Sequence, residues 1–221
     1  MRRALRYTPK GGTRVVAHRT ASAAECIGSL YSDVHVTGLT AGQFSSIDAL
    51  EHIVNQLGPC HAWVSTWTTG LYDVQRAAIL MQNQRLLGVR FMLDRGTFEK
   101  SPKFAGPVIE AFGVEAIRCM AVHAKVTVFV DADHVPLAVM RSSMNLNKNL
   151  RTEQFDISVC SAVAGFYAEW FETLWDESGV GFDNVAIMTA VFNRFAALPI
   201  SRDLVSEDDD LAGLSLGGLD V

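Results

Sequence analysis

Long apolar runs are absent from this chain of 221 residues. No stretch approaches the roughly 20 apolar residues that a membrane-spanning helix requires. The basic N-terminus is not followed by the apolar segment that a secretory signal carries. No amphipathic helix with a Lys/Arg-rich face, which would favour binding to a membrane surface, is evident. We therefore expect a cytoplasmic protein that does not associate with membranes.

Cysteines are few and widely spaced. The four of them, Cys26, Cys60, Cys119 and Cys160, form no Cys-x-x-Cys pair, so the sequence does not support a zinc knuckle or a thioredoxin-like site. Each lies in or beside an apolar stretch. We expect reduced thiols in a hydrophobic core.

The charge is small in total but uneven along the chain. With 49% hydrophobic and 19% charged residues and a net charge of −5, the composition is that of a globular protein with a large core. Residues 1–22 form a basic arm, residues 23–200 the domain, and residues 201–221 an acidic tail. The arm could neutralise the phosphates of a nucleic acid or be a solvated, flexible terminus. The tail could dock a protein partner through its leucines or be disordered.

Hydrophobic periodicity predicts alternating strands and helices in the first half of the domain. We expect strands at 60–67, 89–93 and 114–120, and helices at 47–57, 73–87 and 103–112. Such alternation favours an α/β layered domain with parallel strand pairing.

The pattern changes in the second half of the domain. Residues 122–131 and 134–142 predict an antiparallel hairpin, followed by a strand at 154–160 and helices at 162–175 and 182–197. On the helix at 162–175, Phe166, Trp170 and Leu174 form the expected core face. The tryptophans at positions 63, 67, 170 and 175 are most simply core residues.

One group of polar residues could carry chemistry. His123 and Lys125 lie two apart, so their side chains emerge on the same face of one strand. Ser143 and Asn145 do the same at the end of the returning strand. If the hairpin turns near Ala132, these four groups meet at one end of the sheet.

Such a group suits a phosphate. An imidazole can attack phosphorus as a nucleophile, while an ammonium, a hydroxyl and an amide can hold the phosphoryl oxygens. Glu153 could orient the imidazole through its other nitrogen. The scheme requires no metal ion and no cofactor. Taken singly, each residue is also typical of an ordinary strand end, so the hypothesis depends on the combination.

The pattern HAK…SSMNLNKNLRTEQF, which begins at His123, resembles the His-x-Lys…Gly-Ser-x-Asn…Glu signature of the phospholipase D superfamily. The likeness is strongest to its short single-motif nucleases of phage and bacterial type. It is most specific over residues 123–156 and extends more loosely over residues 45–177. It implies an α-β-α layered sandwich with a mixed sheet and a metal-independent phosphodiesterase activity.

The resemblance also implies a role for each residue. His123 would be the nucleophile that forms a phosphohistidine intermediate. Lys125, Ser143 and Asn145 would bind the phosphate, and Glu153 would support His123. Members of the family usually bring two such motifs face to face, with the second histidine protonating the leaving oxygen. Because this chain has one motif, the resemblance implies a homodimer.

Two positions depart from the family pattern. The family places an Asp five residues after the Lys, where this chain has Val130, with Asp131 one residue further on. A slip of one residue normally turns a side chain to the other face of a strand, so a structural role for Asp131 is the simpler expectation. Ser142 replaces the family's Gly before the Ser, which could alter a tight backbone there.

Other residues are weaker candidates. Asn147, Asn149 and Arg151 could contact a nucleic-acid backbone or form a plain polar loop. His61 could approach the site or be a core or edge histidine, and Asp94 could line the cleft or lie in a surface turn.

The sequence therefore predicts a nuclease, because the N-terminal arm is basic. The alternative is a catalytically impaired nucleic-acid-binding or adaptor protein of the same fold, which the Val130 departure favours. A phospholipase is a third possibility, since such a site recognises a phosphodiester and not the groups attached to it.

Overall fold

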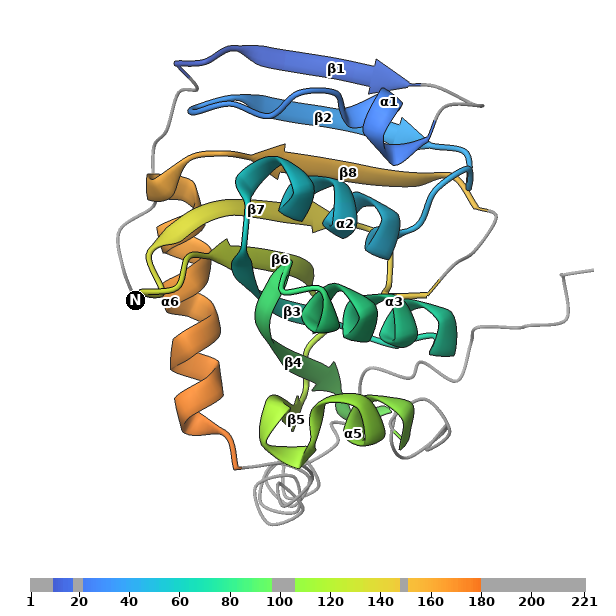
Figure 1. Ribbon diagram of the computed structural model, residues 1–221, viewed down its shortest axis with the longest axis vertical. Coiled ribbons are helices and arrows are strands. Elements are labelled where there is room, and N and C mark those ends of the chain that lie inside the picture. The colour runs from blue at the N-terminus through green and yellow to red at the C-terminus, as the bar shows by residue number, and fades with distance from the viewer. Residues whose placement is uncertain (1–9, 18–21, 97–105, 148–150, 180–221) are drawn as a thin grey trace, which may run out of the picture. The chain divides into compact units, whose positions relative to one another are not determined.

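A computed structural model describes residues 10–17, 22–96, 106–147 and 151–179, which all lie in one unit of the chain, residues 1–184. An eight-stranded sheet forms its centre (Figure 1). The strands are β1 Thr13–Ala17, β2 His35–Thr40, β3 Cys60–Thr66, β4 Leu86–Asp94, β5 Ile117–Met120, β6 Lys125–Val130, β7 Pro136–Ser142 and β8 Glu153–Ser158. The helices are α1 Ala23–Ile27, α2 Ser46–Leu57, α3 Leu71–Gln82, α5 Gly106–Phe112 and α6 Ser161–Glu177, with a 3-10 turn, η2, at Val114–Ala116.

The sheet is mixed, as the sequence predicts. Its strand order is β1-β2-β8-β7-β6-β3-β4-β5. Strands β3, β4 and β5 pair in parallel, and β6 and β7 form the expected antiparallel hairpin. Strand β8 lies between β2 and β7 and is antiparallel to both. The strands close in sequence to the His-x-Lys segment thus lie in the middle of the sheet.

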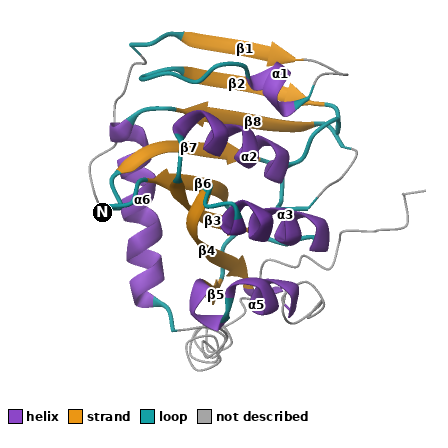
Figure 2. Ribbon diagram, in the orientation of Figure 1, coloured by secondary structure: helices purple, strands orange, loops and turns teal. Residues whose placement is uncertain are grey.

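Helices cover both faces of the sheet, which confirms the layered α-β-α arrangement (Figure 2). Helices α1, α2, α3 and α5 share one apolar cluster with the sheet, whereas α6 belongs to a second cluster. Alternation along β3 separates the two, because Ala62 and Val64 lie in the first cluster and Trp63 in the second.

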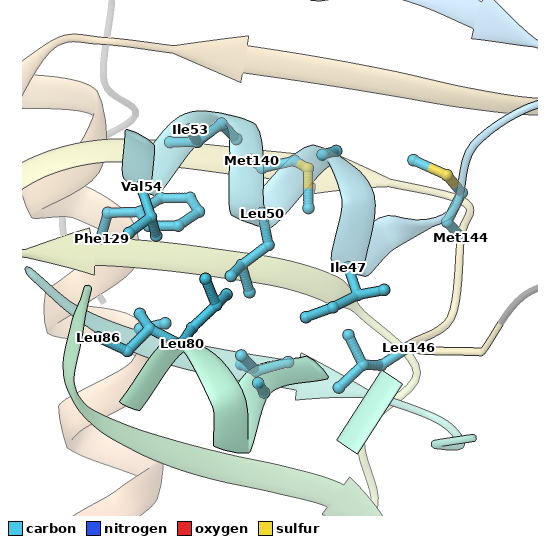
Figure 3. Packing of buried hydrophobic residues seen from close by; sticks show 14 of the residues in the cluster. Ile47, Leu50, Ile53, Val54, Leu80, Leu86, Phe129, Met140, Met144 and Leu146 are labelled. Carbon is cyan, nitrogen blue, oxygen red and sulfur yellow. The ribbon is translucent and has the colours of Figure 1, made fainter. Parts of the chain in front are cut away.

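The larger cluster fixes α2 and α3 against the middle strands (Figure 3). Ile47, Leu50 and Ile53 of α2 are buried beside Leu80 of α3 and Phe129 of β6. Burying one such side chain contributes about 1.5–3 kcal/mol relative to leaving it exposed. This packing holds the ends of β3, β6 and β7 in a fixed relation, and these ends carry the candidate site.

Some predicted boundaries are wrong. The helix expected at 73–87 ends at Gln82, because Gln84 takes a positive φ of 55° and turns the chain, and Leu86 already starts β4. Strand 114–120 begins with a 3-10 turn and is a strand from Ile117 onward. The N-terminal part of the helix expected at 103–112, all of the helix expected at 182–197 and the acidic tail lie outside the described residues.

The buried face of α6 also differs from the prediction. Phe166 is 43% exposed, and Trp170 and Leu174 are only partly buried at the edge of the second cluster. The buried side chains of the helix are Val163, Ala164, Ala168, Phe171 and Trp175. The core face is therefore rotated from the expected one.

The cysteine prediction is confirmed, since all four thiols are free and buried. Burial disfavours the charged thiolate and raises the pKa of Cys60 to about 11. In the described part of the chain, none of the helices has the length and apolar character needed to cross a bilayer.

Candidate functional site

The candidate residues meet where three strands begin or end. Lys125 is the first residue of β6 and pairs with Ser142, the last residue of β7. Ser143 follows directly, and Glu153 opens β8 beside it. Because neighbouring strands here run in opposite directions, residues far apart in the chain share this end of the sheet (Figure 1).

His123 lies just before β6 and not within it, so the expectation that it shares a strand with Lys125 is wrong. The backbone N–H of Val122 bonds to the Asp94 carboxylate and to the Met120 carbonyl, both at 3.1 Å, and the strand therefore starts later. The two side chains still meet. Lys125 Nζ lies 3.2 Å from His123 Nδ1 and 3.4 Å from Nε2.

Lys125 is half-buried, whereas His123 is exposed. Burial lowers the pKa of Lys125 below its ordinary value, and the nearby Glu153 and Asp94 carboxylates act in the opposite direction. A cavity of about 10 Å³ is lined in part by Lys125, Ser142 and Leu146. It offers room for about one water molecule, so a phosphoryl group would have to bind outside it, on the exposed His123 side.

Ser143 and Glu153 are joined directly. The Ser143 hydroxyl donates a hydrogen bond to the Glu153 carboxylate and accepts one from the Gln154 N–H at 3.0 Å. Glu153 thus orients one of the predicted phosphate ligands. Its support of His123 stays a prediction.

Asn145 lies on the segment that borders the Lys125 cavity, between Met144 and Leu146, which both line it. Its Oδ1 is buried and has no hydrogen-bond partner among the described residues. An amide in such surroundings could reorient to direct its N–H groups at a bound phosphate.

The Gly-to-Ser departure is accommodated locally. Ser142 is not among the described residues with a positive φ, so its backbone does not require glycine. Its hydroxyl accepts from the Met144 N–H at 3.1 Å and lies 3.3 Å from the Met144 carbonyl, to which it donates. These bonds shape the turn that carries Ser143 and Asn145.

The other departure lies at the far end of β6 from Lys125. Val130 is fully buried in the cluster under α6. The Asp131 carboxylate accepts hydrogen bonds from the N–H groups of Asp133 and Val135, at 2.9 and 2.8 Å, and so closes the turn between β6 and β7. His61 pairs with Val130, which places His61 at this far end and not near His123.

The weaker candidates are scattered. Asn147 follows Leu146, which bridges to Thr69, and its buried Oδ1 has no hydrogen-bond partner among the described residues. Arg151 is exposed before β8, and Asn149 lies outside the described residues. In the described part of the chain, no three His, Cys, Asp or Glu side chains gather so that they could hold a metal ion.

No family model and no curated protein sequence matches the chain. Solved structures do. NucT from Helicobacter pylori matches with a TM-score of 0.49 at 14% identity, over 67% of this chain and 99% of that one. Nuc from Salmonella typhimurium, described as a phospholipase D family member, matches with a TM-score of 0.46 at 14% identity, over 66% and 96%. In structure the chain is similar to a phospholipase D family member. TrmBL2, an archaeal chromatin protein with a novel mode of DNA binding, matches with a TM-score of 0.43 at 11% identity, over 65% and 53%.

Trp67, which the sequence predicts to be a core residue, is a neighbour of the site. It is 41% exposed, and its ring centroid lies 6.0 Å from that of His123. Its spacing of two from Ser65 and four from Trp63 reads as a continuation of a buried strand face. Strand β3 ends at Thr66, however, so that alternation no longer applies at Trp67.

Proposed function

We propose that the chain is a phosphodiesterase of the phospholipase D type that acts on nucleic acid without a metal ion. The contact between Lys125 Nζ and His123 Nδ1, at 3.2 Å, carries the proposal. It joins a cation that can hold a phosphoryl oxygen to an exposed nucleophile. Asn145 would supply further donors at the same end of the sheet, and Ser143 would add one once its hydroxyl turns from Glu153 to the phosphate.

The reaction follows from these groups. A neutral imidazole nitrogen of His123 attacks phosphorus, and the bond from phosphorus to the leaving oxygen breaks as that oxygen takes a proton from an acid. The Lys125 ammonium offsets the charge that gathers on the phosphoryl oxygens. Water then attacks the phosphohistidine, losing a proton to a base, and its oxygen replaces the histidine nitrogen on phosphorus. The products are an alcohol and a phosphate monoester.

The acid that serves the leaving oxygen would be His123 of a second copy of this chain. The chain has one His-x-Lys motif, and its His123 is exposed in the described unit, so it is accessible to another copy. We therefore propose a homodimer with the two sites face to face. The basic residues that precede β1, among them Arg2, Arg3 and Arg6, would add contacts with the substrate backbone.

The test is cleavage of plasmid, single-stranded DNA and RNA in the presence of EDTA. We expect the wild type to cleave at least one of them, and His123→Ala to reduce the rate by at least about a thousandfold because the nucleophile is lost. His61→Ala is the matched control. It removes a histidine from the opposite end of β3 and should leave cleavage unchanged.

Undiminished cleavage by a folded His123→Ala protein would defeat the assignment. The alternative, a nucleic-acid-binding protein without turnover, is favoured by Val130, which puts a fully buried apolar side chain where the family has an Asp. It predicts salt-sensitive binding by the wild type, no cleavage, and no effect of His123→Ala on that binding.

A further inference from the structure

Trp67 is the most exposed of the four tryptophans. Trp63 and Trp175 are 1% and 8% exposed, whereas Trp67 is 41% exposed. Exposing so large an apolar surface to water is unfavourable. The exposed part of the indole lies beside the proposed nucleophile, where a bound substrate could cover it.

The backbone around Trp67 is fixed to the candidate site. The Thr66 hydroxyl accepts a hydrogen bond from the Leu146 N–H at 3.1 Å and donates one to the Thr68 carbonyl at 3.0 Å. The Gly70 N–H donates to the Leu146 carbonyl at 2.7 Å. Both sides of Trp67 are thus tied to each other or to the segment that carries Asn145. The backbone that carries the indole is therefore preorganised, and little ordering of the chain would be required when a ligand binds.

The imidazole of His123 meets the indole only obliquely. The planes of Trp67 and His123 are inclined at 45° with centroids 6.0 Å apart, so the imidazole does not lie flat on the indole. The indole Nε1 points toward Gly96 at the end of β4, 3.8 Å from where a Cβ of that residue would stand. The exposed 41% of Trp67 thus lies next to the atoms that would hold the phosphate.

A nucleobase is the flat ring that a phosphodiester substrate brings with it. Bases stack on exposed aromatic side chains in proteins that bind single strands, whatever the sequence. In a duplex, each base is already stacked and paired, so an enzyme must break these interactions to expose it, which costs free energy. A stacking surface beside the reacting phosphate therefore favours substrates whose bases are unpaired.

We propose that Trp67 is a stacking platform for an unpaired nucleobase next to the phosphodiester held at His123 and Lys125, and that single-stranded nucleic acid is the preferred substrate class. The inference rests on the proposed function. Trp67 acts here as a specificity-determining residue and takes no part in bond making.

The experiment compares two single-stranded oligonucleotides, one with all its bases and one with abasic nucleotides flanking the cleaved bond. The variants are Trp67→Phe, which keeps a stacking ring, and Trp67→Leu, which keeps apolar bulk against His123 without one. On the intact strand, we expect Trp67→Leu to lower kcat/KM by about 10- to 100-fold and Trp67→Phe to retain most of it. On the abasic strand, all three proteins should be equally slow. Phe166→Leu, which changes an exposed aromatic residue of α6, should match the wild type on both.

Two results would overturn the inference while leaving the proposed function intact. An equal loss on both strands in Trp67→Leu would mean that Trp67 only positions His123. Equal cleavage of duplex and single strand by the wild type would remove the preference for unpaired bases. If the wild type cleaves nothing, the proposed function fails, and a measurement of single-strand binding then tests the role of Trp67. A labelled single strand should then bind more weakly to Trp67→Leu than to the wild type, and unchanged binding would reject the platform.

Discussion

Lys125 lies between an imidazole and carboxylates. Its ammonium contacts both nitrogens of His123 and is influenced by Glu153 and Asp94. Desolvation by burial opposes the charged form and is the largest influence on its pKa, which lies below the ordinary lysine value of about 10.4. The carboxylates limit this decrease. The charge of Lys125, on which the proposed phosphate binding depends, is therefore set by burial and by the opposing effect of the two carboxylates.

This balance predicts a pH dependence. Because only the ammonium form can hold a phosphoryl oxygen, activity should fall as pH rises through the lowered pKa of Lys125, below the pH at which an ordinary lysine loses its proton. Glu153→Gln removes a charge that raises this pKa, while the Gln carbonyl can still accept from Ser143. The alkaline limb of the kcat/KM profile should move to lower pH, whatever happens to the maximal rate.

Glu172→Gln, an exposed change on α6, is the control and should leave the limb in place. An alkaline limb at the same pH in Glu153→Gln and wild type would show that Lys125 does not govern it.

At the scale of elements, α6 shows how the buried face of a helix can be misassigned when apolar residues lie on more than one face. Its sequence offers two stripes, and the one at Phe166, Trp170 and Leu174 is the more regular by spacing. The structure buries the stripe that contains Phe171, which contacts Trp63 and Trp175 at ring-centroid distances of 5.6 and 5.7 Å. The position of the sheet decides between the stripes, and periodicity alone does not report it.

Truncating a residue of each stripe should therefore change the free energy of unfolding by different amounts. Phe171→Ala should lower the free energy of unfolding by about 3–5 kcal/mol, because it empties a fully buried site between two tryptophans. Phe166→Ala, at a residue that is 43% exposed, should change it by no more than about 0.5 kcal/mol. Urea unfolding of both variants measures the difference. Similar losses in the two would mean that α6 packs through the other face.

Elements with a strong local signal could be predicted from the sequence. Helix α2 and strand β3 have regular apolar patterns and clear end signals, and both were found within a residue or so. Strands β1 and β2 were missed. In β1, the apolar Val15 is 81% exposed at the sheet edge. Apolar and polar residues therefore do not alternate along the sequence of this strand. In β2, Gly38 resembles a turn residue, but it lies where the Val16 backbone approaches so closely that a Cβ would stand 2.6 Å from its carbonyl oxygen.

The part of the candidate site that depends on local structure could also be predicted from the sequence. The hairpin of β6 and β7 is local, and it places Lys125 beside Ser142 and Ser143 as the residue spacing suggested. The contributions of Asp94, Glu153 and Trp67 depend on β4, β8 and the end of β3, which reach this end of the sheet through long-range pairing. Spacing along the chain carries no information about the order of strands in a sheet.

At the scale of the whole molecule, one sheet gathers the proposed phosphate ligands and the proposed nucleophile at a single end, and the chain has one His-x-Lys motif. A displacement at phosphorus also needs a proton for the leaving oxygen. In the proposed reaction Lys125 must stay charged to bind the phosphate, so it is poorly suited to donate that proton as well. A second copy of His123 would separate the two roles, with one imidazole neutral and the other protonated.

This division predicts the behaviour of mixed subunits. When wild-type and His123→Ala chains are unfolded together in equal amounts and refolded, about a quarter of the dimers should carry two intact histidines, by random pairing. If both histidines are required, cleavage per wild-type chain should fall to about half that of wild type refolded alone. Mixing with the His61→Ala chain should give no such fall. An activity that stays proportional to the amount of wild-type chain would mean that each subunit works alone, and another group on the same chain would then have to protonate the leaving oxygen.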